Sequence, residues 1–136
     1  MICPACGKDA LIVEYEKIEL DYCPGCHGVW FDSGELELLL EAAGLGSDRK
    51  FLEGVANQLE AKIDEKKRRC PVRRRKMKKV TIDDDKKIIT DICLGGHGIW
   101  FDGGEVNALV KEIAAKSPQT AESARVLGFI GDMFKY

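Results

Sequence analysis

Apolar positions follow two different periods along this chain, and each period occurs twice. Residues 11–22 are rich in β-branched and aromatic side chains around a polar centre at Glu16-Lys17, which predicts a β-hairpin. Residues 77–92 show the same composition, with a turn at Asp83-Asp84-Asp85. Downstream of each hairpin, apolar residues fall at i, i+3, i+4 and i+7, which is typical of an amphipathic helix. These residues are Leu36, Leu39, Leu40 and Ala43, and then Val106, Leu109, Val110 and Ile113.

The two occurrences belong to one repeated sequence. The segment CHGVWFDSGEL at 26–36 recurs as GHGIWFDGGEV at 96–106. Upstream, Cys3-Pro4 aligns with Cys70-Pro71, and Cys23 aligns with Cys93. Self-similarity at a fixed spacing indicates repeated structural units, so we expect two tandem copies, the second of them degenerate.

The first copy has the cysteine spacing of a structural metal site. Two Cys-x-x-Cys pairs are separated by the predicted hairpin, which brings the four thiols together: Cys3, Cys6, Cys23 and Cys26. Zinc favours four sulfur ligands in a tetrahedral arrangement, and a closed site of this kind is structural. Redox pairs are the alternative, but two such pairs at this spacing favour a zinc ribbon.

The second copy lacks two of these cysteines, because Arg73 and Gly96 stand at the equivalent positions. Cys70, Cys93 and His97 remain as three candidate ligands, with His97 four residues after Cys93. Three protein ligands and an open position are typical of catalytic zinc. The alternative is a metal-free ribbon, because Arg73 would place a cation near the ion.

The motif shared by both copies contains polar and aromatic residues with structural roles of their own. Aspartate followed three residues later by glutamate has the spacing of a capping box, which predicts helix caps at Asp32, Glu35, Asp102 and Glu105. Gly28 and Gly98 would permit a tight turn. The aromatic residues would cover the hairpin and helix or contact a partner: Trp30, Phe31, Trp100 and Phe101. A ligand-binding cluster of His27, Asp32 and Glu35, repeated at His97, Asp102 and Glu105, is the alternative.

These elements predict a small α+β metal-bound fold, with two zinc-ribbon units each followed by an amphipathic helix. The first unit spans 1–46 and the degenerate second unit spans 70–117. Ser47 or Asp48 would cap a linking helix over 47–69, and residues 118–136 would form a C-terminal amphipathic helix that docks or pairs two chains. Units this small seldom bury enough apolar surface without a metal or disulfides.

The motif residues resemble the transcription factor zinc-finger family, the TFIIB-type zinc ribbon. Residues 3–6 and 23–36 match its two Cys-Pro-x-Cys knuckles and the Trp-[Leu/Phe]-Asp-x-Gly-Glu-Leu tail. The second copy is similar to the family's Cys-His variant, except that Arg73 departs from it. The resemblance implies a zinc-binding fold and does not specify an activity.

Charge is unevenly distributed over this chain of 136 residues with net charge −2. Residues 66–79 hold ten of the 21 basic residues and no acid, so the rest carry 11 basic against 23 acidic side chains, or −12. The basic residues are Lys66, Lys67, Arg68, Arg69, Arg73, Arg74, Arg75, Lys76, Lys78 and Lys79. Such a segment is a candidate nucleic-acid contact.

The remaining features of the sequence limit where the protein is expected to be located and what it is expected to do. No signal peptide or membrane-spanning run is present in the sequence, so we expect a soluble cytoplasmic protein that does not bind membranes. We predict a non-enzymatic interaction protein with one Zn²⁺ ion and, if the second site is filled, two. Its tandem ribbons would present a surface to a protein partner. The alternative is a nucleic-acid-binding, transcription-associated protein that uses residues 66–79. A homo-oligomer would form through the C-terminal helix.

Overall fold

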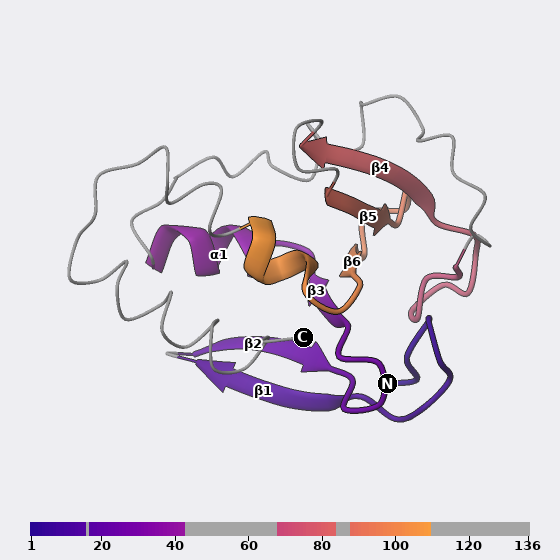
Figure 1. Ribbon diagram of the computed structural model, residues 1–136, viewed down its shortest axis with the longest axis horizontal. Coiled ribbons are helices and arrows are strands. Elements are labelled where there is room, and N and C mark those ends of the chain that lie inside the picture. The colour runs from indigo at the N-terminus through magenta and orange to yellow at the C-terminus, as the bar shows by residue number, and fades with distance from the viewer. Residues whose placement is uncertain (16, 43–67, 84–87, 110–136) are drawn as a thin grey trace.

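The computed structural model describes residues 1–15, 17–42, 68–83 and 88–109 (Figure 1). Its strands are β1 (Leu11–Tyr15), β2 (Ile18–Tyr22), β3 (Val29–Asp32), β4 (Lys78–Asp83), β5 (Ile88–Ile92) and β6 (Gly98–Phe101). Helix α1 spans Glu35–Ala42, and residues 105–109 are also helical. We call residues 1–42 the first half and residues 68–109 the second half.

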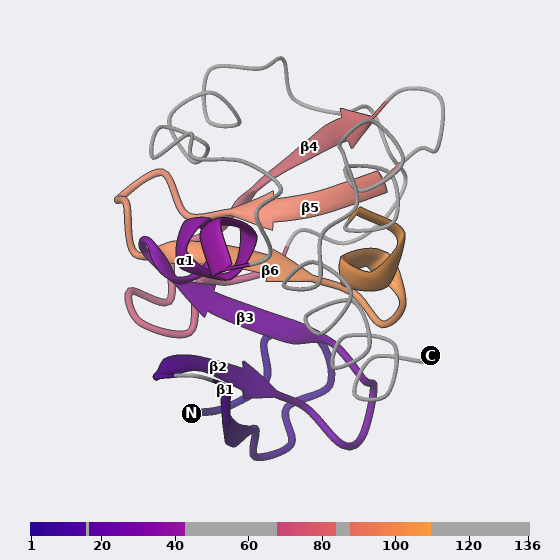
Figure 2. The same ribbon diagram turned by 90° about the vertical axis from the view of Figure 1, so that its left-hand side faces the viewer.

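The strands form one antiparallel sheet in the order β1-β2-β3-β6-β5-β4, which can be followed from bottom to top in Figure 2. The predicted fold class is therefore wrong, because the halves are not two separate ribbon-plus-helix units. They share a continuous six-stranded sheet and one buried seam. The expected linking helix at 47–69 and C-terminal helix at 118–136 lie almost wholly outside the described residues.

Both predicted hairpins are present. β1 pairs with β2 in the register Leu11↔Tyr22 to Tyr15↔Ile18, and Lys17 has the left-handed backbone (φ 69°) that this tight turn needs. β4 pairs with β5 from Lys78↔Ile92 onward, with a register shift between Thr81 and Asp83. The shift lies beside the longer connection of the second hairpin, where the sequence has its additional residues.

The seam between the halves consists of β3 and β6, two strands that the sequence did not predict. They pair antiparallel with Trp30 opposite Trp100, and the side chains of Val29, Trp30 and Phe31 are all buried. A strand that is buried on both faces shows no alternation of apolar and polar residues, so periodicity cannot detect it.

Each half provides space for the tryptophan of the other half. A Cβ atom on Gly28 would lie 2.1 Å from the ring of Trp100, and one on Gly98 would lie 2.6 Å from the ring of Trp30. The two glycines thus serve close packing across the seam, and not a tight turn alone. Phe31 and Phe101 add an edge-to-face contact, with ring centroids 5.8 Å apart.

Helix α1 and helical residues 105–109 lie next to the seam strands (Figure 1). Leu36 and Leu39 of α1 are buried, as are Val106 and Leu109, so the described part of each predicted apolar stripe faces the core. Within the described ranges, no helix has the length and apolar character of a membrane span.

Candidate metal centres

The first half brings its four cysteines together from two tight turns, which we call knuckles. In the first knuckle the N–H of Gly7 donates to the carbonyl of Cys3 (3.0 Å), and Gly7 has a left-handed φ of 78°. In the second knuckle the N–H of His27 donates to the carbonyl of Cys23 (2.8 Å), and His27 has φ 65°. Both turns place their two cysteines on the same side of the loop.

The sulfur positions fit a tetrahedral zinc ion. Sγ of Cys3 lies 3.6 Å from Sγ of Cys26, and Sγ of Cys6 lies 3.4 Å from Sγ of Cys23. Four thiolates about 2.3 Å from one zinc ion are about 3.8 Å apart. Disulfide sulfurs are about 2.05 Å apart, so these cysteines are free thiols arranged around a common centre.

The backbone adds donors that favour thiolates. The N–H groups of Ala5 and Cys6 point to Sγ of Cys3 at 3.3 and 3.5 Å. Burial raises the pKa of Cys3 and of Cys26 nevertheless. For Cys23, burial is outweighed by N–H groups of Cys26 and Gly25 and by the Cys6 thiol, which together lower its pKa to about 7. A divalent cation would hold all four as thiolates, and acid would release it.

The second half gathers Cys70, Cys93 and His97, whose ligand atoms all lie within 4.8 Å of one another. The distance from Sγ of Cys93 to Nδ1 of His97 is 3.7 Å, against about 3.6 Å for a sulfur and a nitrogen that share a tetrahedral zinc ion. Both cysteines are buried.

A one-residue shift in the knuckle turns His97 toward this cluster. Gly96 donates to the carbonyl of Cys93, three residues earlier, and has the left-handed φ of 81°. In the first half the left-handed residue comes one position later, at His27, whose Nδ1 lies 2.7 Å from the hydroxyl of Tyr22. The Gly95-Gly96 pair is thus the sequence signal that distinguishes His97 from His27.

The shared motif residues have partners other than those expected for helix caps. The first helical bond of α1 runs from Leu38 to the carbonyl of Gly34, and the Asp32 carboxylate accepts from the Trp30 indole at 2.9 Å. Asp102 accepts from Trp100 at 3.2 Å. Glu35 accepts from the N–H of Glu19, on β2, at 3.3 Å. Among the described residues, His27, Asp32 and Glu35 do not gather as a metal-binding group.

The second helical segment begins in the same way. Glu105 is its first residue, and the carbonyl of Gly104 accepts the first helical bond, from Ala108. Asp102 precedes that position by two residues, and its backbone carbonyl accepts from the N–H of Glu105 at 3.0 Å. Both helices thus begin directly after a backbone turn that follows the seam strand.

The basic segment divides into exposed and engaged residues. Arg69, Arg73, Arg74, Arg75 and Lys76 are exposed, Lys78 is partly buried, and Lys66 and Lys67 lie outside the described residues. Arg68 forms ion pairs with Asp102 and, at 3.6 Å, with Asp91. Lys79 is only 2% exposed and donates to Asp91 at 2.9 Å.

The ion pair of Lys79 and Asp91 was missed at the sequence level, because a lysine in a basic run gives no sign of burial. Asp91 is 1% exposed, and burial raises its pKa, while the hydrogen bond and charge of Lys79 oppose that rise. The available signal was the position of Asp91 inside an otherwise uncharged strand, β5, with Ile92 after it. Its carboxylate holds one cation from β4 and a second from Arg68.

Four sulfur ligands from two knuckles around a β-hairpin define a zinc ribbon. A model of the transcription factor zinc-finger family, the TFIIB-type zinc ribbon, matches residues 2–42. This segment is therefore a zinc ribbon of that type, with Cys3, Cys6, Cys23 and Cys26 as ligands of one Zn²⁺ ion. Neither the curated proteins nor the solved structures yielded a match.

Proposed function

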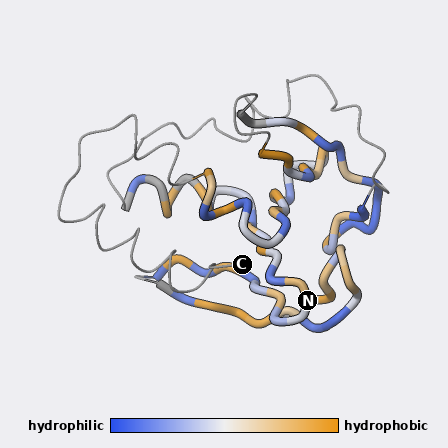
Figure 3. The backbone as a smooth tube through the Cα atoms, in the orientation of Figure 1, coloured by the Kyte–Doolittle hydropathy of each residue, from blue (hydrophilic) through white to orange (hydrophobic). Residues whose placement is uncertain are grey.

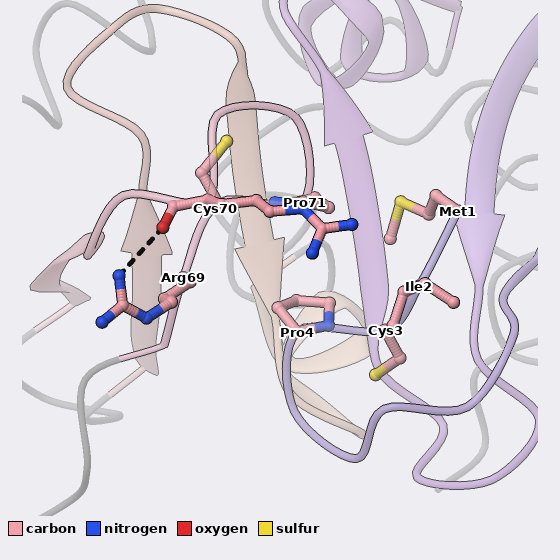
Figure 4. A pocket seen from close by; sticks show the side chains of 8 residues that line it. Met1, Ile2, Cys3, Pro4, Arg69, Cys70 and Pro71 are labelled. Atoms are coloured by element: carbon pink, nitrogen blue, oxygen red, sulfur yellow. Dashed lines mark hydrogen bonds between the residues drawn. The ribbon is translucent and has the colours of Figure 1, made fainter.

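We propose that this zinc-binding protein is a non-enzymatic interaction module that binds a protein segment at the knuckle end of its sheet. The observation that carries the proposal is a pocket of about 370 Å³ between the first knuckles of the two halves (Figure 4). Ligand sites start at about 300 Å³, so this volume accommodates one or two side chains.

The pocket combines an apolar lining with positive charge. Met1, Ile2, Pro4 and Pro71 contribute apolar surface, and Ile2 is 52% exposed. Arg69 and Arg74 also line it, and the Arg69 guanidinium donates to the Arg74 carbonyl at 3.0 Å. Apolar contact beside arginine is typical of the residues that dominate protein interfaces. The fitting occupant is an apolar side chain next to an aspartate or glutamate.

Nucleic-acid binding remains the alternative, supported by the exposed cations of the second half's first knuckle. That knuckle is the hydrophilic loop opposite the N-terminal knuckle in Figure 3. The ion pairs of Arg68 and Lys79 remove two of the ten basic residues from such a role. Binding to phosphates would involve every exposed cation and would weaken steeply with salt.

We infer further that the two halves are tandem copies of one ancestral unit. The matching registers support this, because Ile12↔Asp21 and Lys79↔Asp91 occupy equivalent places in the two hairpins. In that view the second copy has lost two cysteines and retained the seam.

A peptide-display selection on the zinc-loaded full-length chain tests the function. We expect enrichment of peptides with an apolar residue next to Asp or Glu. Fluorescence anisotropy should show that Arg69→Ala lowers the affinity for the selected peptide at least about tenfold. This is the usual consequence of losing a charged hydrogen bond. The matched control is Arg75→Ala, which removes an exposed arginine of the same knuckle that does not line the pocket.

The same two variants distinguish the alternatives. The protein-binding proposal fails if no acidic peptide is enriched and both Arg69→Ala and Arg75→Ala lower the affinity for a DNA or RNA oligonucleotide equally. Binding to the oligonucleotide would then also depend steeply on salt. Equal peptide affinity in the wild type and Arg69→Ala would also contradict it.

A further inference from the structure

The second half keeps a metal-binding turn around Cys70 although its second cysteine is missing. Arg74 donates to the carbonyl of Cys70 at 2.7 Å, as Gly7 does to Cys3, and Arg74 adopts a left-handed φ of 61°. A residue with a Cβ atom rarely adopts that backbone, because the Cβ lies too close to the following carbonyl oxygen. The N–H groups of Val72 and Arg73 bond the Cys70 sulfur, as those of Ala5 and Cys6 bond Cys3. The turn therefore keeps the backbone donors to sulfur that the first knuckle has, although burial raises the pKa of Cys70.

Arg73 lies on the side of this cluster where the first half has its fourth ligand. A Cβ atom on Gly95 would lie 2.2 Å from Nη1 of Arg73, and one on Gly25 would lie 3.5 Å from Sγ of Cys6. The guanidinium of Arg73 thus covers the same knuckle that Cys6 contacts in the first half. A guanidinium group offers only donors and does not bind zinc, so within the described part of the chain three residues gather as ligands and Arg73 does not supply a fourth.

Charge determines what could fill the fourth position. A zinc ion with two thiolates and a neutral histidine has no net charge, whereas the four-cysteine site has a net charge of about −2. The neighbouring Arg73 adds one positive charge. A single negative ligand would neutralise the centre, and a carboxylate suits it because one oxygen can bind zinc while the other accepts from the guanidinium.

We propose that Cys70, Cys93 and His97 hold a second zinc ion whose fourth ligand is a carboxylate from outside the chain, positioned by Arg73. The inference rests on the proposed function only for the source of this group, an acidic side chain of the bound protein segment. The carboxylate site itself needs no partner, because a free carboxylic acid offers the same two oxygens.

Metal counting tests the second ion. Native mass spectrometry should find two zinc ions on the full chain and one on Cys70→Ser and on His97→Gln. His27→Gln is the matched control, since His27 is not part of either cluster, and it should retain two. A single zinc ion on the wild type would overturn the proposal.

Cobalt absorption tests the fourth ligand. We expect acetate to change the visible spectrum of the Co²⁺-loaded chain, because it enters the open position. Arg73→Gln should raise the half-saturating acetate concentration at least about tenfold while two metal ions remain bound. Arg73→Cys should abolish the response and strengthen retention of the second zinc against a chelator by more than about 100-fold, because it closes the site.

Each further outcome has a defined meaning. If acetate changes the spectra of Arg73→Cys and the wild type alike, the open position is not where acetate binds and the proposal fails. An acetate response without any selected peptide would overturn the proposed function and keep the carboxylate site. If a selected acidic peptide shifts the cobalt spectrum of the wild type but not of Arg73→Cys, the carboxylate comes from the partner segment.

Discussion

The two halves have the same order of hairpin, seam strand and helical segment, and they stabilise it by different means. The first half has four sulfur ligands, and its outer strand leaves Ile12 70% exposed. At the equivalent register position the second half has Lys79, buried and paired with Asp91. The comparison teaches that one strand arrangement can form around a four-cysteine cluster in one half and around a buried ion pair in the other.

Removing zinc should have the largest effect on stability, and the effect should differ between the two halves. Cys3→Ser with Cys6→Ser removes a structural site worth about 10–16 kcal/mol, as much as an entire domain's stability. We expect the double variant to lose cooperative unfolding, as measured by circular dichroism and tryptophan fluorescence. Cys70→Ser, the matched change in the second half, should remain folded. Equal damage from both would contradict the comparison.

The seam should respond to added volume from either half. Gly98→Ala places a Cβ atom 2.3 Å from the backbone oxygen of Phe31, which cannot move as a side chain can. We expect a loss of about 3 kcal/mol in the free energy of urea unfolding. Gly28→Ala should cost slightly less, because its clash is with the Trp100 ring.

Gly25→Ala provides the control for the seam variants. Its Cβ atom would lie 2.6 Å from the flexible side chain of Lys8, which can move aside. A stability change below about 1 kcal/mol is expected. A similar loss in Gly25→Ala and Gly98→Ala would show that glycine itself, and not packing at the seam, determines the effect.

A change at the buried ion pair should lower stability, whereas a change at the equivalent position of the first half should not. Lys79→Met removes the nearer cation of Asp91 and should cost about 3 kcal/mol, at the low end for a broken buried pair because Arg68 remains 3.6 Å away. Ile12→Met, at the equivalent exposed position of the first half, should change stability by less than about 0.5 kcal/mol.

The Lys79→Met loss should depend on pH. Lys79 lowers the pKa of Asp91 against the effect of burial, so its removal raises that pKa further above 3.8. The folded carboxyl then holds its proton more tightly than the unfolded one, and stability falls as pH rises from 3.8 through the raised pKa. Urea midpoints at mildly acidic and neutral pH should show the larger loss at neutral pH. A loss that does not change with pH would indicate altered packing instead.

The smallest effect should come from Asp21→Asn, at the first-half position equivalent to Asp91. Burial and, next, the charge of Asp32 raise the pKa of Asp21. Its ionised form is therefore disfavoured in the folded chain, so Asn should slightly raise the urea midpoint at neutral pH. The gain should shrink as pH falls through the raised pKa and vanish below 3.8, where the carboxyl is protonated in both states. A lower midpoint at neutral pH would mean that the carboxylate has a stabilising role.

Local patterns were sufficient for the hairpins, the apolar face of α1 and the four-cysteine cluster. Strand-forming composition, helical periodicity and Cys-x-x-Cys spacing act over short distances, so the sequence records them directly. The pairing of β3 with β6 joins residues about 70 positions apart, and the same residues also suited a helix cap. Only the contact across the seam explains why glycine precedes each Trp-Phe-Asp segment, and no short-range pattern contains that contact.

The seam also has a consequence for how the chain holds together. The β3–β6 register pairs Trp30 with Trp100 and Val29 with Phe101, and exchanging equivalent residues of the two strands leaves that register unchanged. This is the geometry of an isologous interface, which two identical subunits would normally form. Here both sides belong to one polypeptide, so their association is intramolecular and does not weaken on dilution. The two sides differ in the residues that they gather, four cysteines in the first half and two cysteines with a histidine in the described part of the second.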